Sequence, residues 1–191
     1  CYAQCLKVQQ DHVESLTNIG QVRHALGDVA SAQDAFHKAL QLDSKFVPAI
    51  VNLALVHQDL QQLDISVSLL EKAKKASPDN EHILFNLAVI LQEKGEVQAS
   101  IKAYREVLQL NPHHDGAKTN YSALLNSQGE YSKSIDTLLA NSEVATLSAE
   151  AANNLGVAYF QERKFDDAVK SFSRALDVDP DHAPAHKNLG D

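Results

Sequence analysis

The chain repeats itself every 34 residues, and this internal period limits its possible folds more than any other feature of the sequence. Residues 81–114 show the unit clearly, with apolar residues at helical spacing over 82–94 and again over 97–110. Between the two segments, Gly95 can take the left-handed backbone that ends a helix. After the second segment, Pro112 prevents the helix from continuing. The unit is therefore predicted to be a pair of antiparallel helices, and neither helix can bury its apolar stripe alone.

The same unit recurs along the whole chain without insertion or deletion. Five complete copies follow one another at 13–46, 47–80, 81–114, 115–148 and 149–182. Within each copy the turn between the two helices is expected near one equivalent residue, Gly27, Gln61, Gly95, Gly129 or Arg163. Small residues recur where the two helices must approach closely: Gly20 with Ala32, Ala54 with Ser66, Ala88 with Ser100, Ser122 with Ser134, and Gly156 with Ala168.

A period of 34 residues with paired helices resembles the tetratricopeptide repeat. The resemblance extends over residues 1–191 and implies an all-α fold, a right-handed superhelical solenoid of antiparallel helix pairs. In such an array each repeat contacts only its neighbours, so the chain is expected to form one solenoid domain.

Both ends of the sequence fall inside a repeat. Residues 1–12 match the last third of a preceding repeat, and residues 183–191 begin a sixth, so we interpret the chain as a fragment of a longer protein. The interrupted end is expected to expose apolar surface that a further helix would cover. Cys1 and Cys5 lie one helical turn apart, which suits neither a complete zinc site nor a structural disulfide. We expect buried, reduced thiols there.

Repeat four, 115–148, departs from the pattern at its end. Asn141 replaces a small apolar residue, no proline closes the unit, and residues that favour turns are frequent over 141–146. We predict that 141–146 is the segment least protected from hydrogen exchange. Two interpretations are open, a loosely packed helix end or a functional bend between repeats four and five.

Charge and motifs argue against catalysis and against several kinds of partner. The formal net charge is −8 and no basic stripe is present, which disfavours nucleic acid. No apolar run approaches the roughly 20 residues of a membrane span, and no signal-peptide pattern opens the chain. The nine histidines are scattered and are expected to be solvated or to cap helices. We therefore expect an intracellular, cytoplasmic protein without enzyme activity, metal site, cofactor or direct membrane insertion.

An asparagine stands at one equivalent position in the first helix of every repeat, and this series is the main candidate for a binding site. Its members are Asn18, Asn52, Asn86, Asn120, Asn154 and Asn188. Asparagine is a poor helix former, so its repetition lowers helix stability. Each amide can bond the backbone of a bound peptide, or can bond a neighbouring helix and fix the stack, and both roles can hold together. The series resembles the asparagine ladder in the repeat region of O-linked N-acetylglucosamine transferase.

First helices line the concave side of tetratricopeptide arrays, so the resemblance identifies groove residues beside the asparagines. These residues are largely apolar and are expected to form a partner-binding patch: Val51, Leu55, Phe85, Val89, Val157 and Phe160. Some of them can instead pack between first helices. The charged groove residues are mainly acidic, namely Glu14, Asp59, Glu93 and Glu150 against Lys187, so an acidic ligand would be repelled.

These observations predict a protein–protein interaction scaffold that binds a neutral or basic, partly apolar peptide segment in its concave groove. The expected partner is a protein or peptide, and no oligomeric state follows from the sequence. Two alternatives stay open. One is a structural spacer or assembly element of a multiprotein complex. The other is the non-catalytic targeting arm of an enzyme whose active domain lies outside these residues.

Overall fold

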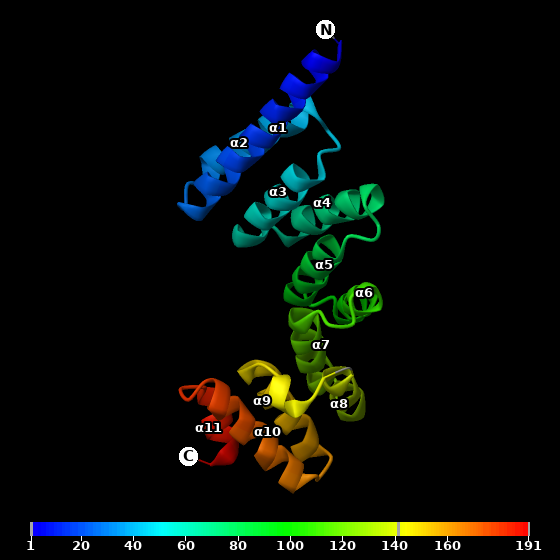
Figure 1. Ribbon diagram of the computed structural model, residues 1–191, viewed down its shortest axis with the longest axis vertical. Helices are drawn as coiled ribbons and strands as arrows, with labels where there is room; N and C mark the ends of the chain where they lie inside the picture. The colour runs from blue at the N-terminus through cyan, green and yellow to red at the C-terminus, as the bar shows by residue number, and fades with distance from the viewer. Residues whose placement is uncertain (1, 141, 191) are drawn as a thin grey trace. The chain divides into compact units, whose positions relative to one another are not determined.

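The computed structural model describes residues 2–140 and 142–190, with side chains from residue 12 onward. Over these residues it is all helical, with eleven α-helices, one short 3₁₀ helix and no strand (Figure 1). The predicted all-α array of paired helices is confirmed. None of the described helices combines the length and apolar character needed to cross a membrane. The side chains of Cys1 and Cys5 lie outside the described part of the chain, as does Asn141.

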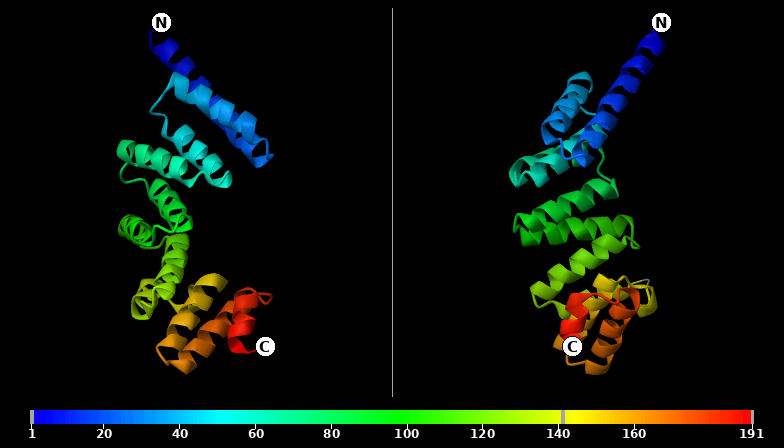
Figure 2. Two further views of the ribbon diagram at one scale, coloured as in Figure 1. Left: turned by 180° about the vertical axis from the view of Figure 1, so that it is seen from behind. Right: turned by 90° about the vertical axis from the view of Figure 1, so that its left-hand side faces the viewer.

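The first of two compact units spans Cys1–Ser100. Its helices are α1 (Tyr2–Ala25), α2 (Val29–Leu42), α3 (Val47–Asp59), α4 (Leu63–Ala76), α5 (Glu81–Glu93) and the start of α6 (Val97–Leu110). Each helix packs on the next in the chain from α1 to α5, and α1 also contacts α3 (Figure 2). The core between repeats one and two is built from Phe36, Ala39, Leu53 and Val56, all buried.

The second unit spans Ile101–Asp191. After the rest of α6 it contains α7 (Asp115–Ser127), α8 (Tyr131–Leu139), the 3₁₀ helix η1 (Val144–Thr146), α9 (Ala149–Gln161), α10 (Phe165–Val178) and α11 (Ala183–Leu189). Helix α9 packs on α7, α8 and α10, and α10 packs on α11. Leu138, Leu155 and Ala175 are fully buried in the core that joins repeats four and five.

The structure differs from the sequence-based division at its start. Residues 1–12 match the end of a preceding repeat in sequence, whereas in the structure α1 continues from Tyr2 to Ala25 as one helix of 24 residues. Three of the later repeats end with a proline, for example Pro78 and Pro180, which prevents the helix from continuing. The equivalent residue before repeat one is Gln10, which is a good helix former. Residues 2–12 therefore extend α1.

The turns inside the helix pairs lie where the sequence predicts them. All five turn residues have a left-handed backbone, including the two that are not glycine, Gln61 with φ of 58° and Arg163 with φ of 60°. At the Gln61 turn the Gln61 N–H donates to the Gln58 carbonyl at 2.8 Å, and the Gln62 N–H donates to the His57 carbonyl at 2.8 Å. This pair of hydrogen bonds is the Schellman helix end, and it recurs at all five turns.

Glycine at either non-glycine turn is expected to stabilise the protein. Because a left-handed backbone strains a side-chain-bearing residue, Gln61→Gly and Arg163→Gly should each raise the free energy of unfolding by about 0.5–1 kcal/mol, after the entropy that glycine adds to the unfolded chain. Urea unfolding measures this as a higher midpoint at constant slope. As a control, Gln62→Gly should lower the midpoint, since φ of Gln62 is −92°. A Gln61→Gly midpoint at or below that of wild type would contradict the expectation.

The small residues bring the two helices of each pair into direct contact, as the sequence predicts. In three repeats a serine hydroxyl of the second helix donates to a backbone carbonyl of the first: Ser66 to Ala54 at 2.7 Å, Ser100 to Ala88 at 2.8 Å and Ser134 to Ser122 at 3.3 Å. In repeats one and five the first helix carries glycine. A Cβ on Gly20 would lie 2.5 Å from the Phe36 ring, and one on Gly156 would lie 2.5 Å from the Phe172 ring.

Repeat four has a shortened second helix. Helix α8 ends at Leu139 after 9 residues, whereas α2, α4, α6 and α10 each have 14. The chain then passes through η1 before α9 begins at Ala149. The low protection expected over 141–146 stays a prediction. Hydrogen exchange tests it by comparison with residues 103–108 of α6, and equal protection in the two segments would show it to be wrong.

Candidate peptide-binding face

The first helices of the repeats contact one another in a row in each unit, α1, α3 and α5 in the first and α7, α9 and α11 in the second. In the first unit neighbouring helices of the row are joined by polar contacts that recur with the repeat. His24 Nε2 lies 2.6 Å from Asp59 Oδ2 and joins α1 to α3. One repeat later Gln58 Nε2 donates to Glu93 Oε1 at 2.7 Å and joins α3 to α5. The row is thus held at its carboxyl-terminal edge by two equivalent bridges.

The predicted site residues of the first unit lie on this row, at the surface of the protein. Val51, Leu55, Phe85 and Val89 are half-buried, and so are Asn52 and Asn86, while Asn18 is exposed. Within α3, Val51 and Leu55 are one turn apart, and Phe85 and Val89 have the same spacing in α5. The Asn52 amide donates to the Pro48 carbonyl of its own helix at 2.7 Å. We name these seven residues the first-unit face.

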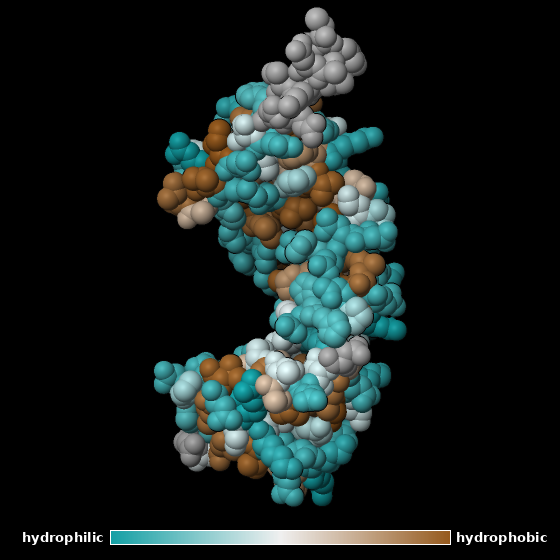
Figure 3. Space-filling model, viewed as in Figure 1, coloured by the Kyte–Doolittle hydropathy of each residue, from teal (hydrophilic) through white to brown (hydrophobic). Residues whose placement is uncertain are grey.

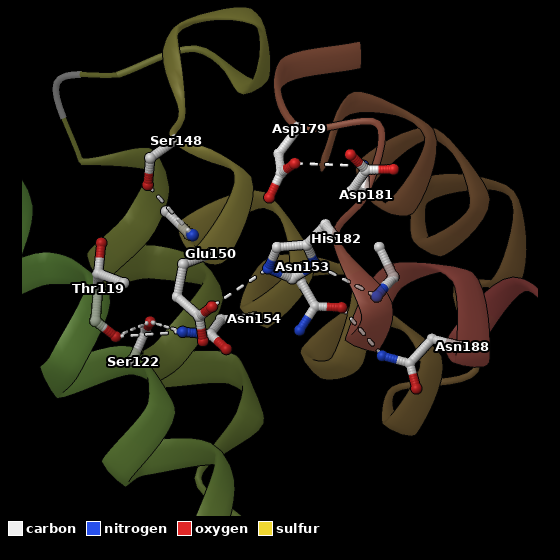
Figure 4. A network of polar contacts seen from close by, with 12 residues as sticks. Thr119, Ser122, Ser148, Glu150, Asn153, Asn154, Asp179, Asp181, His182 and Asn188 are labelled. Atoms are coloured by element: carbon white, nitrogen blue, oxygen red, sulfur yellow. Dashed lines mark hydrogen bonds and ion pairs between the residues drawn. The ribbon is translucent and has the colours of Figure 1, made fainter. Parts of the chain in front are cut away.

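Two asparagines of the series in the second unit, Asn154 and Asn188, join neighbouring helices (Figure 4). Asn154 on α9 is only 7% exposed. Its Nδ2 donates to the Thr119 carbonyl of α7 at 3.2 Å and approaches the Ser122 hydroxyl at 3.4 Å. Asn188 Nδ2 on α11 donates to Asn153 Oδ1 on α9 at 3.0 Å. The stacking role left open by the sequence therefore operates at these two positions, which does not test whether the amides also bind a ligand.

The remaining predicted residues of the second unit are partly accessible. Asn120 and Val157 are half-buried, and Phe160 is 52% exposed. Phe160 packs edge-to-face against Phe165, the first residue of α10, with 5.6 Å between ring centroids. Sequence reasoning missed Phe165, although it is the only phenylalanine at a position otherwise held by Val29, Leu63, Val97 and Tyr131.

Two histidines at repeat junctions cap helices, which is one of the two roles expected for them. His114 Nδ1 accepts from the Ala117 N–H at 3.1 Å, and His182 Nδ1 accepts from the Ala185 N–H at 3.2 Å. His182 Nε2 also lies 3.2 Å from Glu150 Oε2, so this carboxylate belongs to a junction contact (Figure 4). Among the side chains that the structure describes, no three His, Cys, Asp or Glu residues gather as a possible metal site.

The sequence analysis did not identify Lys118 as a candidate residue. Among the residues that the structure describes, it is the only lysine, arginine, aspartate or glutamate that is buried, at 3% exposure. It stands in α7 where the other repeats have Leu16, Ile50, Leu84 and Ala152, so comparison of the repeats could have found it. Its Nζ donates to the Ala140 carbonyl, just past the end of α8, and to the Ser142 hydroxyl at 2.8 Å. The segment after α8 is therefore anchored by an ammonium group. Burial lowers the pKa of Lys118, against a smaller opposing effect of the Asp115 carboxylate.

The lowered pKa of Lys118 predicts a pH dependence of stability. The unfolded chain holds this proton more tightly than the folded chain, so the free energy of unfolding should rise with pH between the lowered pKa and the ordinary lysine value of about 10.4. Lys118→Met removes the titration and is the matched control, because every other group remains. Chemical unfolding of both proteins measured from about pH 8 to about pH 10.4 should show a steeper rise in the wild type. Parallel curves would contradict the expectation.

Comparison with known proteins places the repeats in a family. Models of the tetratricopeptide repeat match residues 13–46, 47–80, 82–114 and 149–182, which coincide with repeats one, two, three and five. No curated protein sequence matches the chain significantly. The matched segments together cover more than half of the sequence.

Several solved structures share the fold at low sequence identity. YrrB, a tetratricopeptide repeat protein, is 19% identical with a TM-score of 0.75, over 99% of this chain and 97% of YrrB. MamA is 23% identical with a TM-score of 0.75, over 91% and 95%. A tetratricopeptide repeat protein from Parabacteroides merdae is 19% identical with a TM-score of 0.80, over 93% and 71%. With its period, its paired helices, its Schellman turns and these matches, the chain belongs to the tetratricopeptide repeat family, whose arrays act as protein-interaction scaffolds.

Proposed function

We propose that the first-unit face binds an extended, partly apolar segment of another protein. The observation that carries this proposal is the placement of apolar side chains beside amides on adjacent helices. Val51 and Leu55 flank Asn52 on α3, and Phe85 and Val89 flank Asn86 in the same way on α5. All of these side chains keep part of their surface accessible. An apolar surface with a few interspersed hydrogen-bonding groups is typical of peptide-binding sites.

The charges of this face favour a neutral or basic ligand. Asp59 and Glu93 are both exposed at the carboxyl-terminal edge of the row, and the Asp59 side chain is 62% accessible. Their partners within the row are a histidine and a glutamine, and no lysine or arginine among the described side chains pairs with either carboxylate. An acidic ligand would meet like charge, whereas a lysine or arginine would meet a carboxylate.

The amides have different roles in the two units under this proposal. In the second unit the Asn154 and Asn188 side chains already bond neighbouring helices. The hydrogen bond of the Asn52 side-chain amide to Pro48 stays within α3. The side-chain oxygen of Asn52 can accept a hydrogen bond from the backbone of a ligand. A backbone contact holds many sequences alike, so the apolar side chains supply the selectivity. YrrB, which shares this fold, is described as having an unusual peptide-binding site, and that description supports a peptide ligand here.

Introducing a carboxylate into the apolar surface tests the proposal. Peptides of about 12 residues, long enough to span roughly 40 Å when extended, would be selected from a random displayed library against the whole chain. Leu55→Asp and Val89→Asp should each weaken the selected peptides by at least about tenfold, because binding would bury an unpaired carboxylate. Ile65→Asp is the matched control, since Ile65 is 46% exposed on the second helix α4 of the same unit. Equal affinities for all three variants would reject the proposed face.

A further inference from the structure

Two adjacent first helices, α3 and α5, present the same short series of side chains. Each series has two apolar residues followed by a carboxylate, one helical turn apart: Val51, Leu55 and Asp59 on α3, and Phe85, Val89 and Glu93 on α5. The four apolar side chains are half-buried and both carboxylates are exposed. Figure 3 shows apolar surface beside polar surface over the region of α3. We name the two series the α3 row and the α5 row.

The carboxylate that ends each row is restricted to these two helices. The residues equivalent to Asp59 on α1, α7 and α9 are Ala25, Ser127 and Gln161, and none of them is charged. The rows are therefore not a general feature of the repeat. They mark a site that extends over two neighbouring first helices.

Both carboxylates can accept further hydrogen bonds. Asp59 Oδ2 contacts His24 Nε2, and Glu93 Oε1 accepts from the Gln58 amide. A carboxylate has about four lone-pair sites on its two oxygens, so one such contact leaves room for a ligand. The Asp59 side chain is 62% accessible. A lysine or arginine of a bound peptide can therefore reach each row at the same relative position.

The spacing of the rows favours one peptide conformation. Packed helices lie about 8–10 Å apart, so the two rows repeat at about this distance. A polyproline II helix has three residues per turn and rises about 3.1 Å per residue, so it presents the same side every ~9 Å. A β-strand does so every ~6.6 Å and an α-helix every ~5.4 Å. Of the three conformations, polyproline II matches the rows.

We propose that the α3 row and the α5 row select a polyproline II segment with a three-residue period, in which each triplet carries one apolar residue and one lysine or arginine. The apolar residues contact Leu55 and Val89. The basic residues pair with Asp59 and Glu93, which lie about 6 Å further along each helix. The inference rests on the proposed peptide-binding function and specifies its ligand class. Such a segment is already extended before binding, which lowers the entropy lost on association.

Two synthetic peptides of identical composition test the period. One consists of four Leu-Lys-Pro triplets. The other consists of two copies of Lys-Leu-Leu-Pro-Lys-Pro, in which no two leucines and no two lysines are three residues apart. Fluorescence anisotropy with the full chain should show at least about fivefold tighter binding of the triplet peptide.

Matched variants test the role of the carboxylates. Asp59→Asn combined with Glu93→Gln should bring the two affinities within about twofold of each other. Asp64→Asn combined with Glu71→Gln removes the same charge from exposed positions on the second helix α4 and should leave the preference unchanged. Unchanged helicity by circular dichroism confirms that each variant is folded.

The outcomes separate this inference from the proposed function. Equal affinities for the two peptides, both weakened by Leu55→Asp, would overturn the three-residue period and leave the first-unit face in place. A preference that survives Asp59→Asn with Glu93→Gln would overturn the pairing with the carboxylates. Binding of neither peptide, or affinities that Leu55→Asp does not change, would overturn the first-unit face and this inference together.

Discussion

Gly156→Ala is expected to lower the free energy of unfolding of the second unit by about 1–3 kcal/mol, the usual effect of overpacking a well-packed core. The added Cβ would lie 2.5 Å from two ring carbons of Phe172, closer than real Cβ contacts allow. Phe172 is 3% exposed, so its ring cannot swing into solvent without losing its core contacts. Denaturant unfolding followed by circular dichroism measures the loss as a lower midpoint.

A compensating variant distinguishes a steric clash with Phe172 from any other destabilising effect of alanine at position 156. Repeat two has Ala54 and Leu70 at the equivalent positions, and both are fully buried. Gly156→Ala combined with Phe172→Leu should therefore recover much of the stability that the single change removes, as expected for residues in direct contact. If Gly156→Ala alone is as stable as wild type, α9 and α10 do not approach each other at this point as closely as described.

Asparagine substitutions are expected to separate into two classes. Asn154→Ala should lower the free energy of unfolding by about 1–3 kcal/mol, because buried groups on α7 lose their partner. Asn52→Ala with Asn86→Ala should leave the melting temperature nearly unchanged and should weaken diverse extended peptides to a similar extent. Each lost hydrogen bond contributes about 0.5–1.5 kcal/mol, so the double variant should bind about fivefold to a hundredfold more weakly.

Phe85→Ala is the matched comparison for the asparagine variants. It removes apolar contact area and leaves the amides in place, so it should discriminate among peptides that the asparagine variants weaken alike. The ladder would belong to the scaffold alone if Asn86, Asn120 and Asn154 were all changed to alanine and the folded fraction still bound peptides with unchanged affinity.

The helix pairs and their turns could be predicted because they depend on repeated positions. Gln61 and Arg163 would not be chosen as turn residues on their own, yet both have a left-handed backbone at the positions where the other repeats have glycine. The stack imposes this backbone on them, since packing of both flanking helices exceeds the local strain of about 1–2 kcal/mol. The period therefore predicts these turns better than the residue types do.

The start of α1 could not be predicted in the same way. The match of residues 1–12 to the end of a repeat rests on a few apolar positions, and Gln10 gives no signal to end the helix. The shortened α8 was only partly foreseen. Turn-forming residues after Leu139 pointed to an irregular end, but the anchor is Lys118, which lies 22 residues away in sequence from the carbonyl it bonds.

The sequence predicts which helices carry the asparagines, but it does not predict the environment of each one. The period places every asparagine on a first helix, and the structure agrees with that. Their burial depends on what the neighbouring helix offers. Asn154 is buried because Thr119 and Ser122 lie opposite it, whereas Asn18 has no preceding helix pair beside it among the described residues and is exposed. Such differences between equivalent positions come from tertiary neighbours, which a single sequence does not specify.

The most direct test of the proposed peptide-binding face is to map a bound peptide on the chain. A library-selected peptide of about 12 residues would be titrated into the isotope-labelled protein, and backbone and methyl signals would be followed by nuclear magnetic resonance. We expect the largest shifts on the first helices α3 and α5, at Val51, Leu55, Phe85 and Val89, and we expect Leu55→Asp to abolish them. Shifts confined to the second helices α2 and α4, or shifts that survive Leu55→Asp, would contradict this expectation.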